Sequence, residues 1–180
     1  MLIGEDGIGP FRLGMPIPAD LLKEEPDKRY TARFYADAQP LEGFGFEAPP
    51  VFVAVLGGPF HAWGKTHLEL PPPAHVAKRA IMLARSGKLT VAMVVIASPE
   101  PCTAKGIGVG SSYAELRRAY PAAQARMLPG LWEEPSCVVD LEPSGPVRVF
   151  FAKCGRADGG TGASIDPGEK AIRVVVAPPS

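Results

Sequence analysis

Short hydrophobic runs recur along this chain, and stretches rich in Gly, Pro and Asp separate them. Runs of this kind, rich in Val, Ile and Phe and bounded by turn-forming residues, predict β-strands. The expected strands are residues 31–36, 43–47, 51–56, 89–97, 137–141, 147–152 and 171–177. Residues 91–96 are apolar at both alternating positions, so we expect both faces of that strand to be covered.

One segment instead has the pattern of a short helix. Ser112 and Glu115 are three residues apart, as in a capping box. In that motif the Ser oxygen accepts a hydrogen bond from the helix backbone, and the Glu carboxylate accepts one from the backbone of the Ser. Leu116 and Tyr120 then share one face, and a proline follows at once and ends the helix. A helix this short is not stable alone, so its apolar face must lie on a sheet.

An internal repeat organises the chain. Residues 7–16 are followed by Asp20-Leu21, and residues 106–112 by Glu115-Leu116. Both stretches combine a glycine-rich entry, an apolar residue before Gly and an acidic-Leu helix start, and such self-similarity indicates repeated units. This pattern predicts an α+β protein with two related halves that form one compact unit. The halves are residues 1–98 and 99–180, each a short helix packed on an antiparallel β-meander.

Residues 76–85 allow two interpretations. The prolines at 71–73 and the glycine at position 87 favour a helix between them. Alignment of the two halves, however, matches residues 78–85 with residues 147–153, which contain the predicted strand 147–152, and favours a strand. We predict the strand, as part of a hairpin.

Composition excludes several classes of protein. The 180 residues include 19 Lys+Arg and 19 Asp+Glu, so the formal net charge is zero. That balance argues against a general nucleic-acid binder and against a polybasic membrane binder. The longest apolar run, residues 89–97, is about half the length of the ~20-residue helix that crosses a membrane. The first ten residues lack the basic and apolar regions of a signal peptide, so the chain is expected to be cytoplasmic as written, or periplasmic or secreted if a signal was removed.

Two of the three cysteines flank a predicted hairpin. Folding about Gly145-Pro146 places Cys137 and Cys154 opposite or diagonal to each other, within the ~7 Å between Cα atoms that a disulfide tolerates. A Cys137–Cys154 disulfide, which implies an oxidising compartment, and two buried thiols in a reduced protein both fit this pattern. Cys102 is expected to be an ordinary loop thiol.

No convincing catalytic set or cofactor motif is found in the sequence. His61, His67 and His75 lie in one stretch, but none has the i, i+4 spacing of a zinc-binding helix and no Cys or acidic cluster completes a ligand set. They are therefore only weak candidates for a metal site. Residues 57–66 lack the first glycine of a P-loop, and no βαβ unit surrounds residues 106–110. We expect no metal, no cofactor and no enzymatic activity.

Two turn-rich stretches carry large apolar side chains. Phe60 and Trp63 lie in the first half, and Leu131 and Trp132 occupy a comparable place in the second. Trp is frequent at the energetic centres of protein interfaces. These four residues are the candidates for partner binding, and the alternative is that the Trp side chains cover the core of the sheet.

The repeated segments carry a family resemblance. Leu13-Gly14-Met15-Pro16 with Asp20-Leu21, and Val109-Gly110-Ser111-Ser112 with Glu115-Leu116, resemble the Gly-Met-Thr/Ser-x-x-Glu-Val helix start of small bacterial envelope domains. These domains include the small lipoprotein of outer-membrane assembly and the β-lactamase inhibitor proteins. The inhibitors are tandem repeats of a helical segment on an antiparallel sheet, and they bind protein partners without catalysis. The resemblance implies this architecture, but no binding residue of those families carries over to this chain.

These observations together predict a non-enzymatic protein-binding module whose partner is another protein. An envelope factor, an inhibitor or an immunity-type protein fits this description. Two alternatives remain open, a small-molecule or metal-binding protein and an enzyme whose site is dispersed in the sequence.

Overall fold

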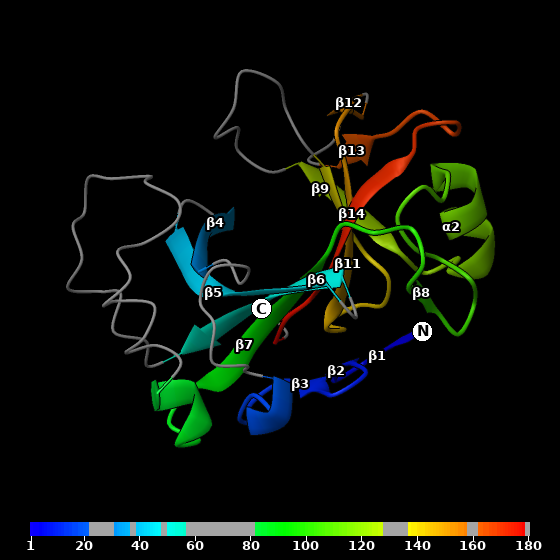
Figure 1. The fold of residues 1–180 in the computed structure, drawn as a ribbon. Coiled ribbons are helices and arrows are strands. Elements are labelled where there is room, and N and C mark those ends of the chain that lie inside the picture. The colour runs from blue at the N-terminus through cyan, green and yellow to red at the C-terminus, as the bar shows by residue number, and fades with distance from the viewer. Residues whose placement is uncertain are drawn as a thin grey trace.

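The computed structural model describes residues 1–21, 31–36, 39–47, 50–56, 82–127, 137–157 and 162–178 (Figure 1). The described chain is mostly β, with 46% strand and 12% helix. Its strands form one large sheet, one four-stranded sheet and one two-stranded sheet.

The large sheet has eight strands in the order β4-β5-β6-β7-β14-β11-β10-β9, and every neighbouring pair is antiparallel. The first half of the chain supplies one side and the second half supplies the other. The two sides meet where β7 pairs with β14, with Ile96 opposite Val174 (Figure 1). The strand bounds are β4 Thr31–Ala36, β5 Gln39–Glu47, β6 Pro50–Leu56, β7 Thr90–Ile96, β9 Gln124–Met127, β10 Cys137–Asp140, β11 Val147–Phe151 and β14 Ala171–Val176.

Shorter elements surround this sheet. The four-stranded sheet has the order β3-β2-β1-β8, and β1 and β8 run parallel. The described helices are the 3-10 turn η1, the α-helix α2 and a helical segment at residues 82–85. The bounds of the named elements are β1 Leu2–Gly4, β2 Gly7–Ile8, β3 Phe11–Arg12, η1 Ala19–Leu21, β8 Cys102–Thr103, α2 Tyr113–Ala119, β12 Gly155–Arg156 and β13 Ala163–Ser164.

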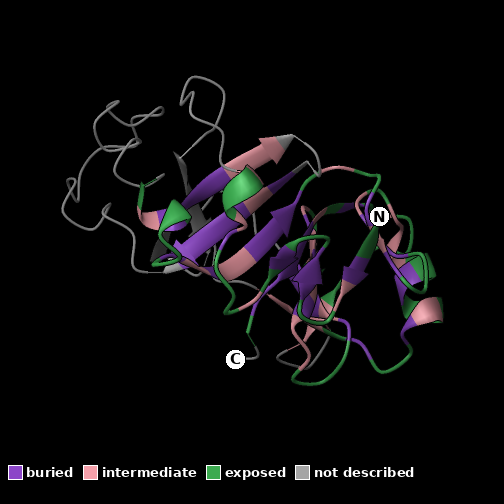
Figure 2. Cartoon of the chain, turned by 60° about the horizontal axis from the view of Figure 1, so that its bottom comes forward, coloured by how far each residue is buried: buried purple, intermediate pink, exposed green. Residues whose placement is uncertain are grey.

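The main hydrophobic core lies on one face of the large sheet. It contains alternate residues of the central strands, such as Val94 and Ile96 of β7 and Val174 and Val176 of β14. Leu116 of α2 and residues of the four-stranded sheet lie in the same core, which follows the buried (purple) strands of Figure 2. Because side chains alternate across a strand, the intervening residues point to the opposite face. There a smaller buried cluster forms from Val95, Val175 and Ala177.

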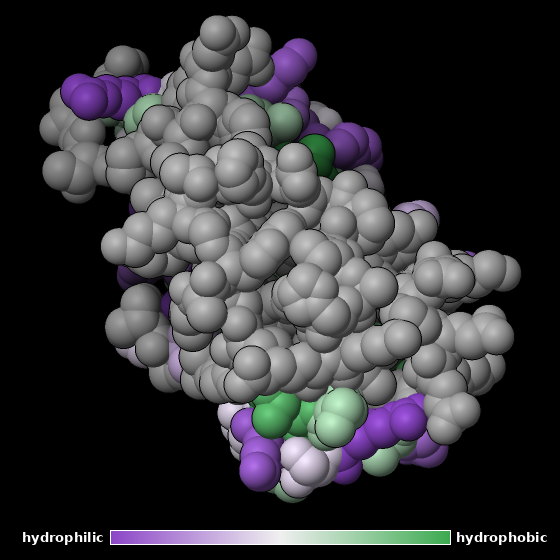
Figure 3. Space-filling view, turned by 60° about the vertical axis from the view of Figure 1, so that its left-hand side comes forward, coloured by the Kyte–Doolittle hydropathy of each residue, from purple (hydrophilic) through white to green (hydrophobic). Residues whose placement is uncertain are grey.

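Figure 3 shows the surface on the side of β4 and β5. At its lower end, small hydrophobic (green) and hydrophilic (purple) areas of the described residues lie next to one another. Large hydrophobic side chains that are exposed come from separate segments, including Met82 in the helical segment 82–85 and Leu2 on β1. Isolated exposed hydrophobic residues are common on protein surfaces.

The predicted α+β architecture is wrong, because the described structure is mostly β. The prediction placed a helix on each half, yet where the first helix was expected to begin, the described residues form only the single turn η1, which buries none of its residues. The pattern of short apolar runs predicted strands more accurately than the repeat predicted a helix in the first half. The strands predicted at 137–141, 147–152 and 171–177 begin where β10, β11 and β14 begin, and each of these strands ends one residue earlier than predicted.

The strand predicted within residues 76–85 is also wrong for the part that the structure describes, because residues 82–85 are helical. The helix ends in a Schellman motif, in which Lys88 N–H donates to Leu83 O (3.0 Å) and Gly87 N–H donates to Ala84 O (2.9 Å). Gly87 has φ 71°, the left-handed conformation that this motif requires. The glycine therefore has the helix-ending role that favoured a helix, and the alignment of the two halves, which favoured a strand, gave the wrong assignment.

The two glycine-rich segments of the proposed repeat make the same backbone contacts. Gly14 donates its N–H to Val91 O in β7 (2.8 Å), and Gly110 donates its N–H to Ala171 O in β14 (2.7 Å). Val91 N–H in turn donates to Met15 O (2.9 Å), and Ala171 N–H donates to Ser111 O (2.8 Å). Both glycines have positive φ, 74° and 87°. Each segment thus lies along the first residues of the last strand of its own half.

Candidate functional site

A cavity of about 350 Å³ lies between β1, the residues after β8 and the turn that joins β10 to β11. Buried side chains form its floor, and they come from four separate parts of the chain. The floor residues are Ile3, Thr103, Tyr120, Leu141 and Val147. A volume of this size is at the low end of the range of about 300–1,000 Å³ seen for ligand pockets.

The floor belongs to the same structure as the main core. Ile3 of β1 and Val147 of β11 are members of the core cluster, as is Tyr120, which forms the C-cap of α2. Besides the hydroxyl of Tyr120, the floor has the polar side chain of Thr103, whose Oγ1 accepts a hydrogen bond from Ile107 N–H at 3.2 Å. The floor therefore offers chiefly apolar contact.

The rim of the cavity is charged. Glu5, Lys105 and Glu142 line it and are exposed, and the small side chain of Ala104 lies beside them. Lys105 Nζ is 4.3 Å from the centroid of the Tyr120 ring, a cation–π contact. Among the ion pairs of the described residues, none includes Glu5 or Glu142. The rim thus carries two carboxylates and one ammonium group.

The turn on one side of the cavity is held in a defined conformation. Gly145 N–H donates to Glu142 O (2.9 Å), and Leu141 N–H donates to Val147 O (3.1 Å). Ser144 adopts a left-handed conformation with φ 59°, which is uncommon for a residue other than Gly. Ala177 N–H donates to Pro146 O (2.9 Å) and connects the turn to the residue after β14.

A disulfide closes the hairpin at its other end. Cys137 and Cys154 have their sulfurs 2.05 Å apart and their Cα atoms 6.0 Å apart. Cys137 is paired with Phe151 across the two strands, so a residue just beyond β11 can reach it. Of the two readings left open by the sequence, the structure has the disulfide, and Cys102 is a free, half-buried thiol.

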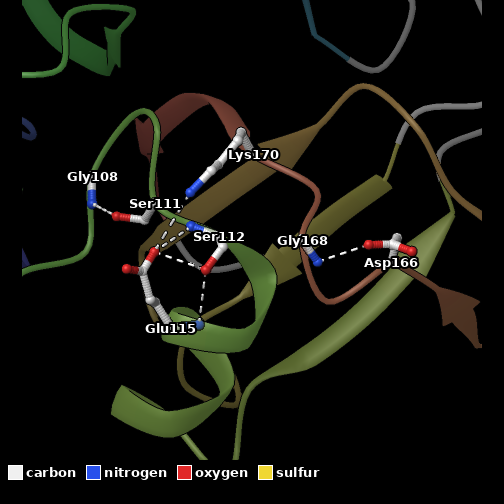
Figure 4. A network of polar contacts seen from close by, with 7 residues as sticks. All are labelled: Gly108, Ser111, Ser112, Glu115, Asp166, Gly168 and Lys170. Atoms are coloured by element: carbon white, nitrogen blue, oxygen red, sulfur yellow. Dashed lines mark hydrogen bonds and ion pairs between the residues drawn. The ribbon is translucent and has the colours of Figure 1, made fainter.

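The capping residues Ser112 and Glu115 form a structural motif (Figure 4). Ser112 N–H donates to Glu115 Oε2 (2.7 Å), and Glu115 N–H donates to Ser112 Oγ (3.3 Å). The hydrogen bonds from the backbone and hydroxyl of Ser112, together with the charge of Lys170, hold the pKa of the Glu115 carboxyl below its usual value. These contacts account for both side chains as the start of α2.

Other side chains in the same region also bind backbone. Ser111 Oγ accepts from Gly108 N–H (3.0 Å), and Asp166 Oδ1 accepts from Gly168 N–H (2.7 Å), as Figure 4 shows. Lys170 Nζ lies 4.0 Å from Glu115 Oε2. This polar network positions the segments that lead into α2 and β14.

A second group of charges crosses the face opposite the main core. Arg126 Nε and Arg148 Nε each lie 3.2 Å from a carboxylate oxygen of Asp140, so the ion pairs connect β9, β10 and β11. Arg148 Nη2 also donates to Pro178 O (3.2 Å). On neighbouring β14, burial lowers the pKa of Arg173. These contacts hold adjacent strands of the second half together.

The remaining predicted site residues lie outside the described part of the structure. They are the partner-binding candidates Phe60, Trp63, Leu131 and Trp132 and the histidines His61, His67 and His75. Within the described residues, no cluster of three or more His, Cys, Asp or Glu has a metal-binding arrangement. The helices of that same part of the chain include none long and apolar enough to cross a membrane.

The cavity itself was not predicted. Its lining comes from residues 3–5, 103–105, 120, 141–142 and 145–147, which belong to segments far apart in the sequence. No local motif connects them, because they meet only through the parallel pairing of β1 with β8 and the position of the β10–β11 turn. The predicted turn around Gly145-Pro146 was the one sequence feature that indicated any part of the cavity wall.

Comparison with known proteins assigns no function. No family model and no curated protein matches the chain. Among solved structures, the uncharacterized protein YfeY from Escherichia coli is similar with a TM-score of 0.49 and 12% sequence identity, over 98% of this chain and 99% of that one.

Proposed function

We propose that this chain is a non-enzymatic protein-binding module and that the cavity beside the β10–β11 turn is part of its binding surface. The observation that carries the proposal is the contrast between an apolar floor and a charged rim. Protein interfaces have this organisation, with an apolar centre that is buried on binding and a polar periphery.

A further feature of the cavity supports the same proposal. The hydrogen bonds of the 142–146 turn and the Cys137–Cys154 disulfide fix one side of the cavity before a partner arrives. Preorganisation of this kind lowers the entropic cost of binding.

The envelope or extracellular setting belongs to the same proposal. Disulfides are typical of proteins that fold in oxidising compartments. The two glycine-rich segments resemble in sequence the helix starts of small envelope domains that bind proteins. We propose on these grounds that the two halves are tandem copies of one unit and that an envelope factor or an inhibitor describes the protein best.

An obstructed cavity tests the proposal. Ala104 is exposed and lines the rim, so Ala104→Trp should fill the entrance at little cost to stability. Ala114→Trp on α2 is the matched control, because Ala114 is also exposed but lies outside the lining. Affinity capture from cells of the source organism, quantified by mass spectrometry, should recover a partner with the unchanged protein and with Ala114→Trp. Ala104→Trp should retain less than about a tenth of it. Equal recovery by both variants, or no partner at all, would contradict the proposal.

The predicted aromatic candidates need a separate measurement. A Trp63→Ala/Trp132→Ala variant should lose most of the partner if these side chains bind it. Full retention by this variant, with loss in Ala104→Trp, would restrict binding to the cavity.

Small-molecule binding is the second candidate, because the cavity volume falls within the range of ligand pockets. A screen of small apolar and amphipathic compounds by thermal unfolding would test it. A compound that raises Tm in the unchanged protein and in Ala114→Trp, but not in Ala104→Trp, would support this role.

A further inference from the structure

The chemistry of the cavity indicates which group of a partner it receives. The floor presents mainly hydrocarbon and one aromatic ring. Its polar side-chain groups are the Tyr120 hydroxyl and Thr103 Oγ1, and the latter accepts a hydrogen bond from Ile107 N–H. An occupant therefore gains most by placing an apolar portion on this floor, since burying a polar group without a partner is costly.

The rim favours a positive charge on the outer part of the same occupant. Glu5 follows β1 and Glu142 follows β10, so the two carboxylates reach the cavity from different segments. The rim ammonium, that of Lys105, lies over the Tyr120 ring, where the ring face attracts it. Asp6, next to Glu5, is bound to Arg12, whereas Glu5 and Glu142 make no ion pair within the described residues. An anionic occupant would face two carboxylates and a single ammonium.

We propose that the cavity receives a Lys or Arg side chain of the partner protein, with its methylene stem on the floor and its charge beside Glu5 and Glu142. This assignment rests on the proposed protein-binding function. Lys and Arg bury their stems along apolar surface while the charged group stays at the periphery, which matches an apolar floor below an acidic rim. A cavity of about 350 Å³ suits one such side chain better than a large cofactor.

Short peptides test this chemistry without knowledge of the partner. The full chain, labelled with ¹⁵N, is titrated at low ionic strength with acetyl-Gly-Arg-Gly-amide, acetyl-Gly-Leu-Gly-amide and acetyl-Gly-Glu-Gly-amide. The Arg peptide should shift the amide signals of Gly4, Ala104 and Gly145, which line the cavity. It should bind about three- to tenfold more tightly than the Leu or Glu peptide, since exposed ion pairs contribute only modestly to affinity.

Paired charge variants distinguish the cavity from the net charge of the protein. Glu5→Gln/Glu142→Gln should abolish the preference for Arg over Leu. Asp20→Asn/Glu100→Gln removes the same charge from exposed residues outside the lining and should leave the preference unchanged. Salt at 0.5 M should also reduce the preference, because it screens exposed charges.

The outcomes separate this inference from the proposed function. Equal binding of the Arg and Leu peptides, tighter binding of the Glu peptide, or no shift at the cavity amides would overturn the assignment of a basic side chain. If Ala104→Trp still loses the captured partner, the protein-binding function survives that result. If the Arg peptide binds at the cavity but Ala104→Trp retains its partner, the cavity is a site for a basic side chain but does not take part in binding that partner.

Discussion

The two glycine-rich segments contact the sheet alike and then continue differently. After Gly14 the chain forms the single turn η1, with no buried residue, whereas after Gly110 it forms α2, with Leu116 fully buried. Pro16 and Ser112 occupy matching places. Pro16 forms an isolated β-bridge with Thr90, the residue before Val91, and Ser112 forms one with Lys170, the residue before Ala171. Val91 and Ala171 are the residues whose carbonyls accept from Gly14 and Gly110. Pro16 has no side-chain oxygen to accept from a helix backbone, and Ser112 does. The shared backbone contact therefore anchors each segment, and of the two matching positions Ser112 alone carries a capping side chain.

The largest difference between the halves should appear when the first-turn leucines are truncated. Leu116→Ala should lower the free energy of unfolding by about 3 kcal/mol, because it leaves a cavity in the core. Leu21→Ala should cost about 1 kcal/mol, since Leu21 is only partly buried against the same core. Urea denaturation of both variants measures the difference. Equal losses would show that η1 contributes to the core as α2 does.

The disulfide gives the second half a cross-link that the described first half does not share. Its cysteines are 17 positions apart, and closing a loop of that size stabilises a protein by about 3 kcal/mol in the chain-entropy description. Cys137→Ala/Cys154→Ala should lower the urea midpoint, and dithiothreitol should then have no further effect. Cys102→Ser, at the free thiol, is the control and should change stability by less than about 1 kcal/mol. A midpoint that is the same with and without the disulfide would contradict this prediction.

The sequence predicted strands more successfully than helices for a physical reason. Strand runs such as 147–152 are bounded by turn residues, and their alternation survives in β11, where Val147, Val149 and Phe151 are buried. The start of β5 was missed because residues 39–42 lack that alternation. Gly43 of β5 shows what tertiary contact adds, since a Cβ there would lie 2.0 Å from Val53 O in β6. Gly43 fits in this strand because β5 and β6 approach closely at that point, and the local sequence pattern gives no information on that approach.

The candidate site could be predicted only where it is local. The hairpin turn, the disulfide and the capping box each depend on residues close in sequence, and all three are present. The cavity depends on β1 pairing with β8 across about a hundred residues, and β1 and β8 are too short to show a strand period. Long-range pairing of very short strands is therefore the part of this fold that the sequence did not reveal.

The shared backbone contact predicts equal effects in the two halves. Gly14→Ala and Gly110→Ala should each destabilise the protein by about 1 kcal/mol, because both glycines have positive φ although a Cβ would meet no atom within 4 Å. Gly155→Ala is a matched control, since that position also has open space but no positive φ, and it should be neutral or slightly stabilising. Chemical denaturation of the three variants measures these effects. A difference of more than about 1 kcal/mol between Gly14→Ala and Gly110→Ala would show that the two anchors are not equivalent.

The cap should account for an effect of similar size, and its dependence on pH distinguishes it from the glycine contacts. Ser112→Ala should cost about 1 kcal/mol, because it removes the oxygen that accepts from Glu115 N–H. The pKa of Glu115 is lowered in the folded protein, first by the hydrogen bond from the Ser112 backbone. A lowered carboxyl pKa stabilises the fold above the unfolded pKa, near 4.5, and this contribution is lost as the pH falls through the folded pKa.

Stability profiles between pH 7 and pH 3 separate the two parts of the cap. Glu115→Gln should be less stable than the unchanged protein at pH 7 and should approach it at pH 3, where the carboxylate becomes protonated. Ser112→Ala keeps the backbone N–H that bonds Glu115 Oε2, so most of the pH dependence should remain in that variant. Parallel profiles for the unchanged protein and Glu115→Gln would mean that the carboxylate does not support α2. In that case, the lack of a capping side chain at Pro16 would not explain why η1, rather than an α-helix, follows the first glycine-rich segment.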